Sequence, residues 1–214
     1  KFAVSGSKDT TLRLWELATA KCLRIFKEHG QGVTDGVISP DGRFVVSGSE
    51  DATVRLWDLA TAKCLRVYKG HEQGVTAVTM TQYGRFMVSG SEDTTLRLWN
   101  PASAKCLRTF KGHNQGVTTI AVTPDRRFIV SGGQDKTLRL WDPTTGQCLQ
   151  TFKGHKERVS AVEVASNGQF MLSGSLDNTI RVWDLASGKT RRILRGHEDE
   201  VTSVVITSDV RFAI

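Results

Sequence analysis

Tryptophan returns at a fixed interval along this chain, and the interval limits the folds open to it. The tryptophans stand 42 residues apart, at Trp15, Trp57, Trp99, Trp141 and Trp183. Starting at Ser5, the sequence divides into five 42-residue units without insertion or deletion. A repeat of this length is typical of folds in which each unit is one supersecondary element that buries its core against its neighbours. Residues 1–214 are therefore predicted to form a single repeat domain.

Each unit alternates apolar and polar side chains with a period of two, as in Thr53-Val54-Arg55-Leu56-Trp57. This period indicates β-strands rather than helices. Turn-forming pairs such as Asp41-Gly42 separate the alternating runs. In the second unit the pattern predicts four short antiparallel strands, A to D, over residues 33–39, 43–49, 53–58 and 63–69. The chain is therefore predicted to be all-β.

Two dipeptides accompany the tryptophan in most units. A Gly-His pair precedes strand A at Gly70-His71, Gly112-His113, Gly154-His155 and Gly196-His197, and the first linker has Glu28-His29 instead. Trp-Asp ends strand C at Trp57-Asp58, Trp141-Asp142 and Trp183-Asp184, with Glu16 and Asn100 at the other two positions. These motifs resemble the WD-repeat β-propeller family over the whole chain. The resemblance implies five four-stranded blades, as a closed five-bladed ring or an arc of a larger propeller.

A serine, a histidine and an aspartate also recur with each tryptophan. The resemblance implies that they form a structural hydrogen-bond chain from the indole through hydroxyl and imidazole to the carboxylate. The sets are His29, Ser47, Asp51 and Trp57; His71, Ser89, Asp93 and Trp99; His113, Ser131, Asp135 and Trp141; and His155, Ser173, Asp177 and Trp183. The same residue types make hydrolase triads. Catalysis needs such a set once, whereas this one returns in every unit, so a structural role is expected.

A further set would form only if the two ends of the chain met. Residues 201–207 have the sequence of a strand A, and the chain starts with strands B, C and D of a blade. If the ends join, His197 would serve Ser5, Asp9 and Trp15. Closure into a ring, or pairing with a second chain, is the hypothesis for these ends; the alternative is a fragment of a larger propeller.

The formal charge of +7, from 29 basic and 22 acidic residues, raises the question of an acidic partner. Many of the basic residues fall on strand D, where Lys and Arg protect an exposed sheet edge against aggregation. This distribution disfavours nucleic-acid binding, which stays an alternative function. No apolar run reaches the ~18 residues of a membrane span. The four cysteines, Cys22, Cys64, Cys106 and Cys148, have neither metal-ligand nor disulfide spacing, which favours free thiols in a reducing, cytoplasmic compartment.

Two departures from the repeat predict local weakness. The C–D turn has Gly146 and Gly188 in the last two units but Ala20, Ala62 and Ala104 in the first three. If that turn needs a left-handed residue, each alanine is strained. Strand A of the second blade contains Asp35-Gly36 in place of packing side chains, so this blade is predicted to be the loosest and to bury a charge.

The predicted function is that of a non-catalytic scaffold for protein–protein interaction, without a cofactor or metal. The alternatives are a nucleic-acid-binding platform and the sensor part of a larger signalling enzyme. Phosphate loops, metal-ligand clusters and nucleophile elbows are not found in the sequence. The candidate partner-binding residues lie in loops that vary between units: Lys136, Lys156, Arg158, Leu176, Asn178 and, in an A–B loop, Tyr83. An apolar Leu176 beside Lys156 and Arg158 favours an acidic and hydrophobic peptide.

Overall fold

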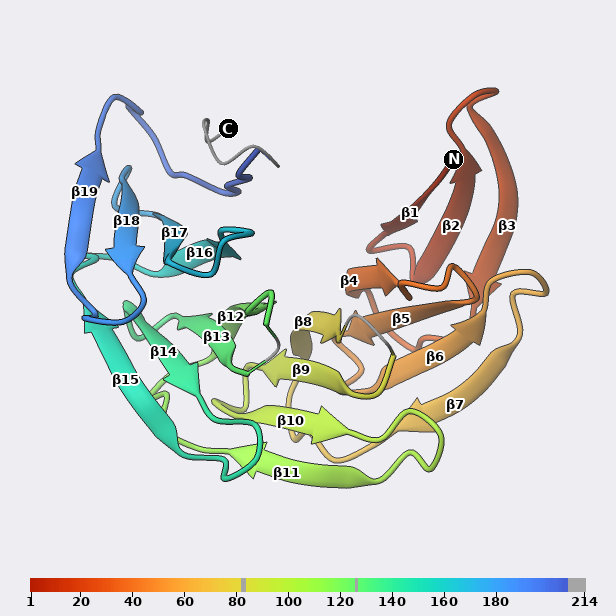
Figure 1. Ribbon diagram of the computed structural model, residues 1–214. Helices are drawn as coiled ribbons and strands as arrows, with labels where there is room; N and C mark the ends of the chain where they lie inside the picture. Colours follow the sequence, from red (N-terminus) through yellow and green to blue (C-terminus); the bar gives the residue numbers. More distant parts are fainter. Residues whose placement is uncertain (82–83, 126, 208–214) are drawn as a thin grey trace. The chain divides into compact units, whose positions relative to one another are not determined.

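The computed structural model describes residues 1–81, 84–125 and 127–207, and in these residues the regular structure is entirely β (Figure 1). The chain forms two compact units, residues 1–109 and 110–214, which are described separately. Closure into a ring concerns how these units meet, so it stays a prediction. Tyr83, one of the candidate binding residues, lies outside the described residues.

Blade 2 shows how the alternating sequence folds. It is an antiparallel sheet of β4 (Val33–Ile38), β5 (Phe44–Ser49), β6 (Val54–Asp58) and β7 (Cys64–Tyr68), ordered as in the sequence. The four predicted strands agree with these to within one residue at each end. Within β6, Val54 and Leu56 are buried and Arg55 between them is half-buried, as expected for side chains that point to alternate faces.

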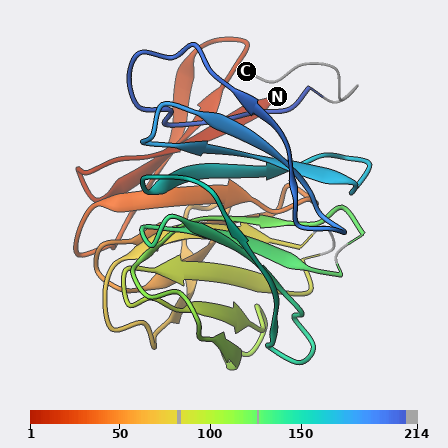
Figure 2. The same cartoon turned by 90° about the vertical axis from the view of Figure 1, so that its left-hand side faces the viewer.

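The other blades repeat this meander. Blade 1 has three strands, β1 (Phe2–Gly6), β2 (Thr11–Glu16) and β3 (Lys21–Lys27), and the remaining blades have four each. They are β8 (Val75–Met80), β9 (Met87–Ser91), β10 (Leu96–Trp99) and β11 (Cys106–Phe110) in blade 3; β12 (Val117–Val122), β13 (Ile129–Gly133), β14 (Thr137–Trp141) and β15 (Cys148–Lys153) in blade 4; β16 (Val159–Val164), β17 (Phe170–Ser175), β18 (Ile180–Asp184) and β19 (Thr190–Leu194) in blade 5. Figure 2 shows β19 crossing β16 at an angle, which reflects the normal twist of a sheet.

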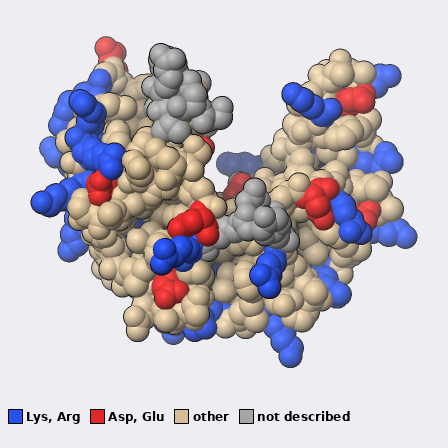
Figure 3. Space-filling view, in the orientation of Figure 1, with Lys and Arg blue, Asp and Glu red and all other residues tan. Residues whose placement is uncertain are grey.

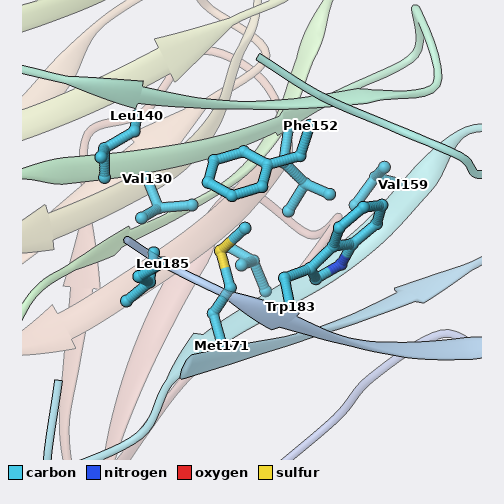
Figure 4. Packing of buried hydrophobic residues seen from close by; sticks show 9 residues of the cluster. Val130, Leu140, Phe152, Val159, Met171, Trp183 and Leu185 are labelled. Carbon is cyan, nitrogen blue, oxygen red and sulfur yellow. The ribbon is translucent and has the colours of Figure 1, made fainter. Parts of the chain in front are cut away.

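The core lies between successive blades, where an aromatic residue of strand D meets the tryptophan of the next blade. In residues 110–214, Phe152 and Trp183 meet edge to face, with ring centroids 5.8 Å apart (Figure 4). The same contact joins Phe26 to Trp57, Tyr68 to Trp99 and Phe110 to Trp141. The strand D aromatics therefore pack between neighbouring blades.

The strand B phenylalanines are buried less uniformly than the strand D aromatics. Phe44, Phe128 and Phe170 are half-buried against the clusters between blades. Phe86 differs from these three, since it is 37% exposed.

The prediction of a strand over residues 201–207 is wrong for the described residues, where only Ile206 forms an isolated bridge. Val201 and Val204 are nevertheless buried against Leu172 and Ile180 of blade 5. The segment is held by other contacts: the Ser160 hydroxyl donates to the Val201 carbonyl, and the Ile206 N–H donates to Glu163. Side-chain contacts with blade 5 thus hold a segment that has no strand ladder of its own.

The predicted left-handed turn is present in all five blades. Ala20, Ala62 and Ala104 have φ of 55°, 58° and 55°, and Gly146 and Gly188 at the same position have 79° and 70°. In this region the Cβ of alanine lies too close to the following carbonyl oxygen, which costs about 1 kcal/mol relative to glycine. The strain expected from the sequence is therefore present in the first three blades.

Asp35 of β4 is half-buried, and its carboxylate joins two blades. One oxygen accepts the N–H of Gly36, and the other accepts the N–H of Val78 in β8 at 2.8 Å. Burial raises the pKa of Asp35, although both hydrogen bonds oppose this shift. The predicted buried charge is thus compensated in part by backbone donors, and the looseness of blade 2 stays a prediction.

The outer strands carry the basic residues. Each of β3, β7, β11, β15 and β19 lies at the edge of its sheet. Figure 3 shows Lys and Arg side chains projecting along the outer margin of each unit. All four cysteines are free, as predicted. Among the described residues no helix is long and apolar enough to span a membrane.

Candidate protein-binding face

Each tryptophan in blades 2 to 5 is the start of a chain of hydrogen bonds. In blade 2 the Trp57 Nε1–H donates to Ser47 Oγ at 2.8 Å, and Ser47 Oγ lies 2.7 Å from His29 Nε2. His29 Nδ1 lies 2.8 Å from Asp51 Oδ2. Because an indole can only donate, the serine hydrogen is free to go to Nε2 and the imidazole proton then sits on Nδ1. This arrangement satisfies every member with a neutral histidine.

The same chain is present in the three blades that follow. The indole-to-serine distance is 2.8 Å and the serine-to-imidazole distance 2.7 Å in each of them. The sets brought together are His71, Ser89, Asp93 and Trp99; His113, Ser131, Asp135 and Trp141; and His155, Ser173, Asp177 and Trp183. The chain ties the linker before strand A to the B–C turn of its blade.

The aspartate at the end of each chain also organises the B–C turn. Asp51 Oδ1 accepts the N–H and the hydroxyl of Thr53, and Oδ2 accepts the N–H of Gly30. Burial alone would raise the pKa of Asp51, but the bonds from Thr53 and His29 outweigh it and lower the pKa to about 2. For His29, burial lowers the pKa and the Asp51 bond only partly opposes it. The pair therefore consists of a carboxylate and a neutral imidazole at neutral pH.

These serines are not placed to act as nucleophiles. Ser47, Ser89, Ser131 and Ser173 are all 0% exposed, and each oxygen already accepts an indole hydrogen. A nucleophile must reach a substrate carbonyl and must be free of such a donor. The buried chains therefore account for the recurring Ser, His and Asp as structural groups.

Blade 1 has part of this arrangement. The Trp15 indole donates to Ser5 at 2.9 Å, and Asp9 accepts the N–H and the hydroxyl of Thr11. Ser5 and Asp9 are exposed and Trp15 is half-buried. His197 is exposed in the second unit. The predicted hydrogen-bond set of His197 with these three residues depends on how the two units meet, so it stays a prediction.

Four of the candidate binding residues lie on two neighbouring loops of blade 5. Lys156 and Arg158, in the linker before β16, are exposed, whereas Leu176 and Asn178, in the β17–β18 turn, are half-buried. The Leu176 N–H donates to the Arg158 carbonyl at 3.0 Å, and the Lys156 N–H donates to Asp177 at 2.9 Å. Two loops that are 20 residues apart in sequence are thus locked together at the end of one blade.

Lys136 is joined to the same surface by an ion pair. It lies in the β13–β14 turn of blade 4, and its ammonium is 3.2 Å from the Glu157 carboxylate. Both side chains are about half exposed, so the pair contributes under ~1 kcal/mol and stays open to exchange. Asn178 donates its amide to the Glu198 carbonyl at 3.0 Å. The loop surface of Lys136, Lys156, Arg158, Leu176 and Asn178, here called the blade 5 face, therefore combines three basic side chains, one of them paired with Glu157, with one apolar side chain.

One contact not foreseen in the sequence explains the first linker. Glu28 replaces the glycine of the other linkers, and its carboxylate lies 2.9 Å from Arg55 Nη1. A Cβ at Gly70 would lie 2.7 Å from the matching Arg97 Nη1, and one at Gly154 would lie 2.6 Å from Arg181 Nη1. The sequence signal that could have predicted this ion pair is a glutamate in the linker, aligned with an arginine in the next blade. The pair is structural and adds nothing to the binding face.

In the described part of the chain no group of three His, Cys, Asp or Glu side chains could hold a metal ion. The sequence pattern of one protein family matches most of the chain. This family is described as WD domain, G-beta repeat, and the matches cover residues 20–58, 62–100, 104–142 and 146–184. Each match runs from the C–D turn of one blade to the end of strand C in the next.

Proposed function

Since the chain belongs to the WD40 repeat family, we propose that it is a non-catalytic scaffold that holds partner proteins. WD40 repeats in general mediate protein–protein interaction. The observation that carries the proposal is the separation of two kinds of polar residue. The Ser, His and Asp side chains that repeat are bonded to each other within blades, whereas the polar residues that vary between blades lie on the loops.

The blade 5 face is proposed as the partner-binding surface. Leu176 offers an apolar contact, and the exposed Lys156 and Arg158 offer positive charge on the adjoining linker. A peptide that combines a large apolar side chain with carboxylates would match both features. The loops need little reordering to bind, because their backbones are already fixed by bonds to Asp177 and Arg158. The four free thiols are the basis for proposing a reducing, cytoplasmic environment.

A capture experiment with two variants tests this surface. Leu176→Asp and the pair Lys156→Glu with Arg158→Glu should each release most of the proteins captured by the wild-type chain from its source cells. Leu149→Asp is the control, because Leu149 is 49% exposed on β15, away from these loops. Capture that is unchanged by both loop variants, or reduced equally by the control, contradicts the assignment.

Leu176→Asp should change the melting temperature by no more than about 2 °C, because a half-buried turn residue contributes little to the core. A large fall would mean that Leu176 is a packing residue. The binding surface would then have to be sought on other loops.

A further inference from the structure

The first unit contains a groove between blades 2 and 3, at the strand ends opposite the B–C turns. Its volume is about 460 Å³. Its walls are mainly apolar and include one basic residue, Arg66. The apolar side chains that line it include Phe44, Leu56, Leu65, Met80 and Pro101. None of these residues belongs to the blade 5 face, so the two surfaces can be tested independently.

A β-bulge exposes the leucine at the mouth of this groove. Leu56 pairs with Arg66 and Trp57 pairs with Cys64, which leaves Leu65 as an extra residue in β7. A bulge turns such a side chain away from the regular alternation of the strand. Leu65 is 44% exposed as a result. The groove therefore keeps apolar surface in contact with solvent.

The polar groups that line the groove are already bonded, with one exception. The Pro101 carbonyl accepts the Tyr68 hydroxyl at 2.7 Å, and the Asp41 carboxylate accepts the Ser39 hydroxyl and the Arg43 N–H. The Arg66 guanidinium is exposed and makes no hydrogen bond or ion pair with any residue in the described ranges. A ligand in this groove would therefore meet one cation whose donors are unused, the Arg66 guanidinium, while the Asp41 carboxylate keeps its negative charge but already accepts two hydrogen bonds.

Equivalent grooves show that this free arginine is not a feature of every blade. Between blades 1 and 2, Arg24 Nε donates to the Ala60 carbonyl at 3.0 Å and Nη1 donates to the Leu23 carbonyl at 2.7 Å. Between blades 4 and 5 the arginine is replaced by Gln150, which lies against Gly188, and the groove shrinks to about 180 Å³. The two grooves beside blade 2 are of similar size, about 500 Å³ and 460 Å³, but only the one between blades 2 and 3 has a strand D arginine without a bond to the described residues.

We propose that this groove binds a short segment of a partner protein in which a large apolar side chain stands next to a carboxylate. The apolar side chain would lie among Phe44, Leu65 and Met80, and the carboxylate would pair with Arg66. Arginine binds a carboxylate through two parallel hydrogen bonds, so this contact selects acidic over basic neighbours. The hollow is large enough for one aromatic side chain, and its apolar walls favour one.

The test uses eight-residue Gly-Ser peptides that carry Phe-Glu, Phe-Lys or Ala-Glu at the centre, added to the full chain. Binding is followed by the NMR methyl signals of Leu65 and Met80. The Phe-Glu peptide should shift these signals and should bind about tenfold more tightly than the Phe-Lys peptide, a difference of ~1.4 kcal/mol. The Ala-Glu peptide should not bind measurably.

The Arg66→Glu variant should reverse the preference, so that the Phe-Lys peptide binds more tightly than the Phe-Glu peptide. Arg24→Glu is the matched control, and it should leave the preference unchanged. The proposal is overturned if Leu65 and Met80 do not respond to the Phe-Glu peptide at millimolar concentration, or if Arg66→Glu leaves the preference as it was. It is also overturned if sodium dodecanoate binds more tightly than every peptide, since the groove would then be a site for lipid acyl chains.

Discussion

Blades 1 and 2 have similar sequences in their B and C strands, yet their tryptophans lie in different surroundings. The two segments read SGSKDTTLRLWE and SGSEDATVRLWD. Trp57 is 0% exposed and packs on Phe26 and His29, whereas Trp15 is half-buried. In both blades the indole donates to its serine, at 2.9 Å in blade 1 and 2.8 Å in blade 2.

The difference shows which part of the motif is local. The indole–serine bond joins residues ten apart on adjacent strands, so it forms in both blades. Burial of the pair requires a strand A and the linker histidine that precedes it. Blade 2 has these in β4 and His29, while in the described residues the sheet of β1, β2 and β3 has no strand in that place. The repeat sequence sets the geometry, and the neighbouring elements supply most of its stability.

The largest expected effect comes from removing the tryptophan itself. Trp57→Ala should lower the free energy of unfolding by about 3–5 kcal/mol, because it leaves a cavity and strands the Ser47 hydroxyl and the His29 imidazole. Trp15→Ala should cost about 1–2 kcal/mol, since the side chain is only half-buried. Urea denaturation measures both. Equal losses would mean that the two blades are equivalent in solution, as expected if the chain closes.

Removing the serine oxygen isolates the hydrogen-bond chain from the packing. Ser47→Ala should cost about 2–4 kcal/mol, because the buried Trp57 N–H and the His29 Nε2 both lose their partner. Ser5→Ala should cost about 0.5 kcal/mol or less, because Ser5 is exposed and water can replace it. The free energy of unfolding of the two variants is compared with that of wild type. A loss below ~1 kcal/mol for Ser47→Ala would contradict the structural role of the chain.

Acidification should weaken the Trp–Ser–His–Asp hydrogen bonds of blade 2 in two pH ranges. The pKa of His29 is lowered by burial, so the unfolded chain binds a proton more readily, and stability falls as the pH drops below ~6.5. The pKa of Asp51 is lowered to about 2, so its contribution is complete above ~3.9 and is lost as the pH falls toward 2. His155 and Asp177 in blade 5 act in the same direction.

The histidine window can be separated with one variant. In His29→Gln the fall in unfolding free energy between pH 7.5 and pH 4.5 should be smaller than in wild type, because one of the histidines that resist protonation is gone. Denaturation curves at several pH values measure the slope. An unchanged or steeper slope would show that His29 does not remain neutral in the folded chain.

The sequence predicted the fold well because each 42-residue unit repeats both its strand pattern and its tryptophan. It also predicted the strained alanines, since Ala20, Ala62 and Ala104 all have left-handed φ. It failed over residues 201–207, where a strand-like sequence forms no strand in the described part of the chain. Strand propensity alone does not make a ladder, which needs a partner strand.

The site was predictable only in part. The repeat register placed Leu176 beside Arg158 and Lys156 correctly, because two aligned loops of one blade always meet. It did not show that Lys136 pairs with Glu157, or that Arg66 is left unbonded where Arg24 is bonded. Those outcomes depend on side-chain rotamers and on contacts between different blades, and periodicity carries no information about either.

The smallest expected effect is a gain in stability at the C–D turn. Ala20 is exposed with φ of 55°, so Ala20→Gly should raise the free energy of unfolding by about 0.5–1 kcal/mol, since glycine adopts this conformation without strain. Ala62→Gly in blade 2 should change it by less, because Ala62 also packs against the core and its methyl group would be lost. Ala18→Gly, two residues earlier and without a positive φ, should instead lower stability by about 0.5 kcal/mol, because glycine raises the conformational entropy of the unfolded chain. Thermal melts of the three variants give the comparison. If Ala20→Gly and Ala18→Gly destabilise equally, the turn in blade 1 is not held left-handed, and the strain assigned to the first three blades is absent.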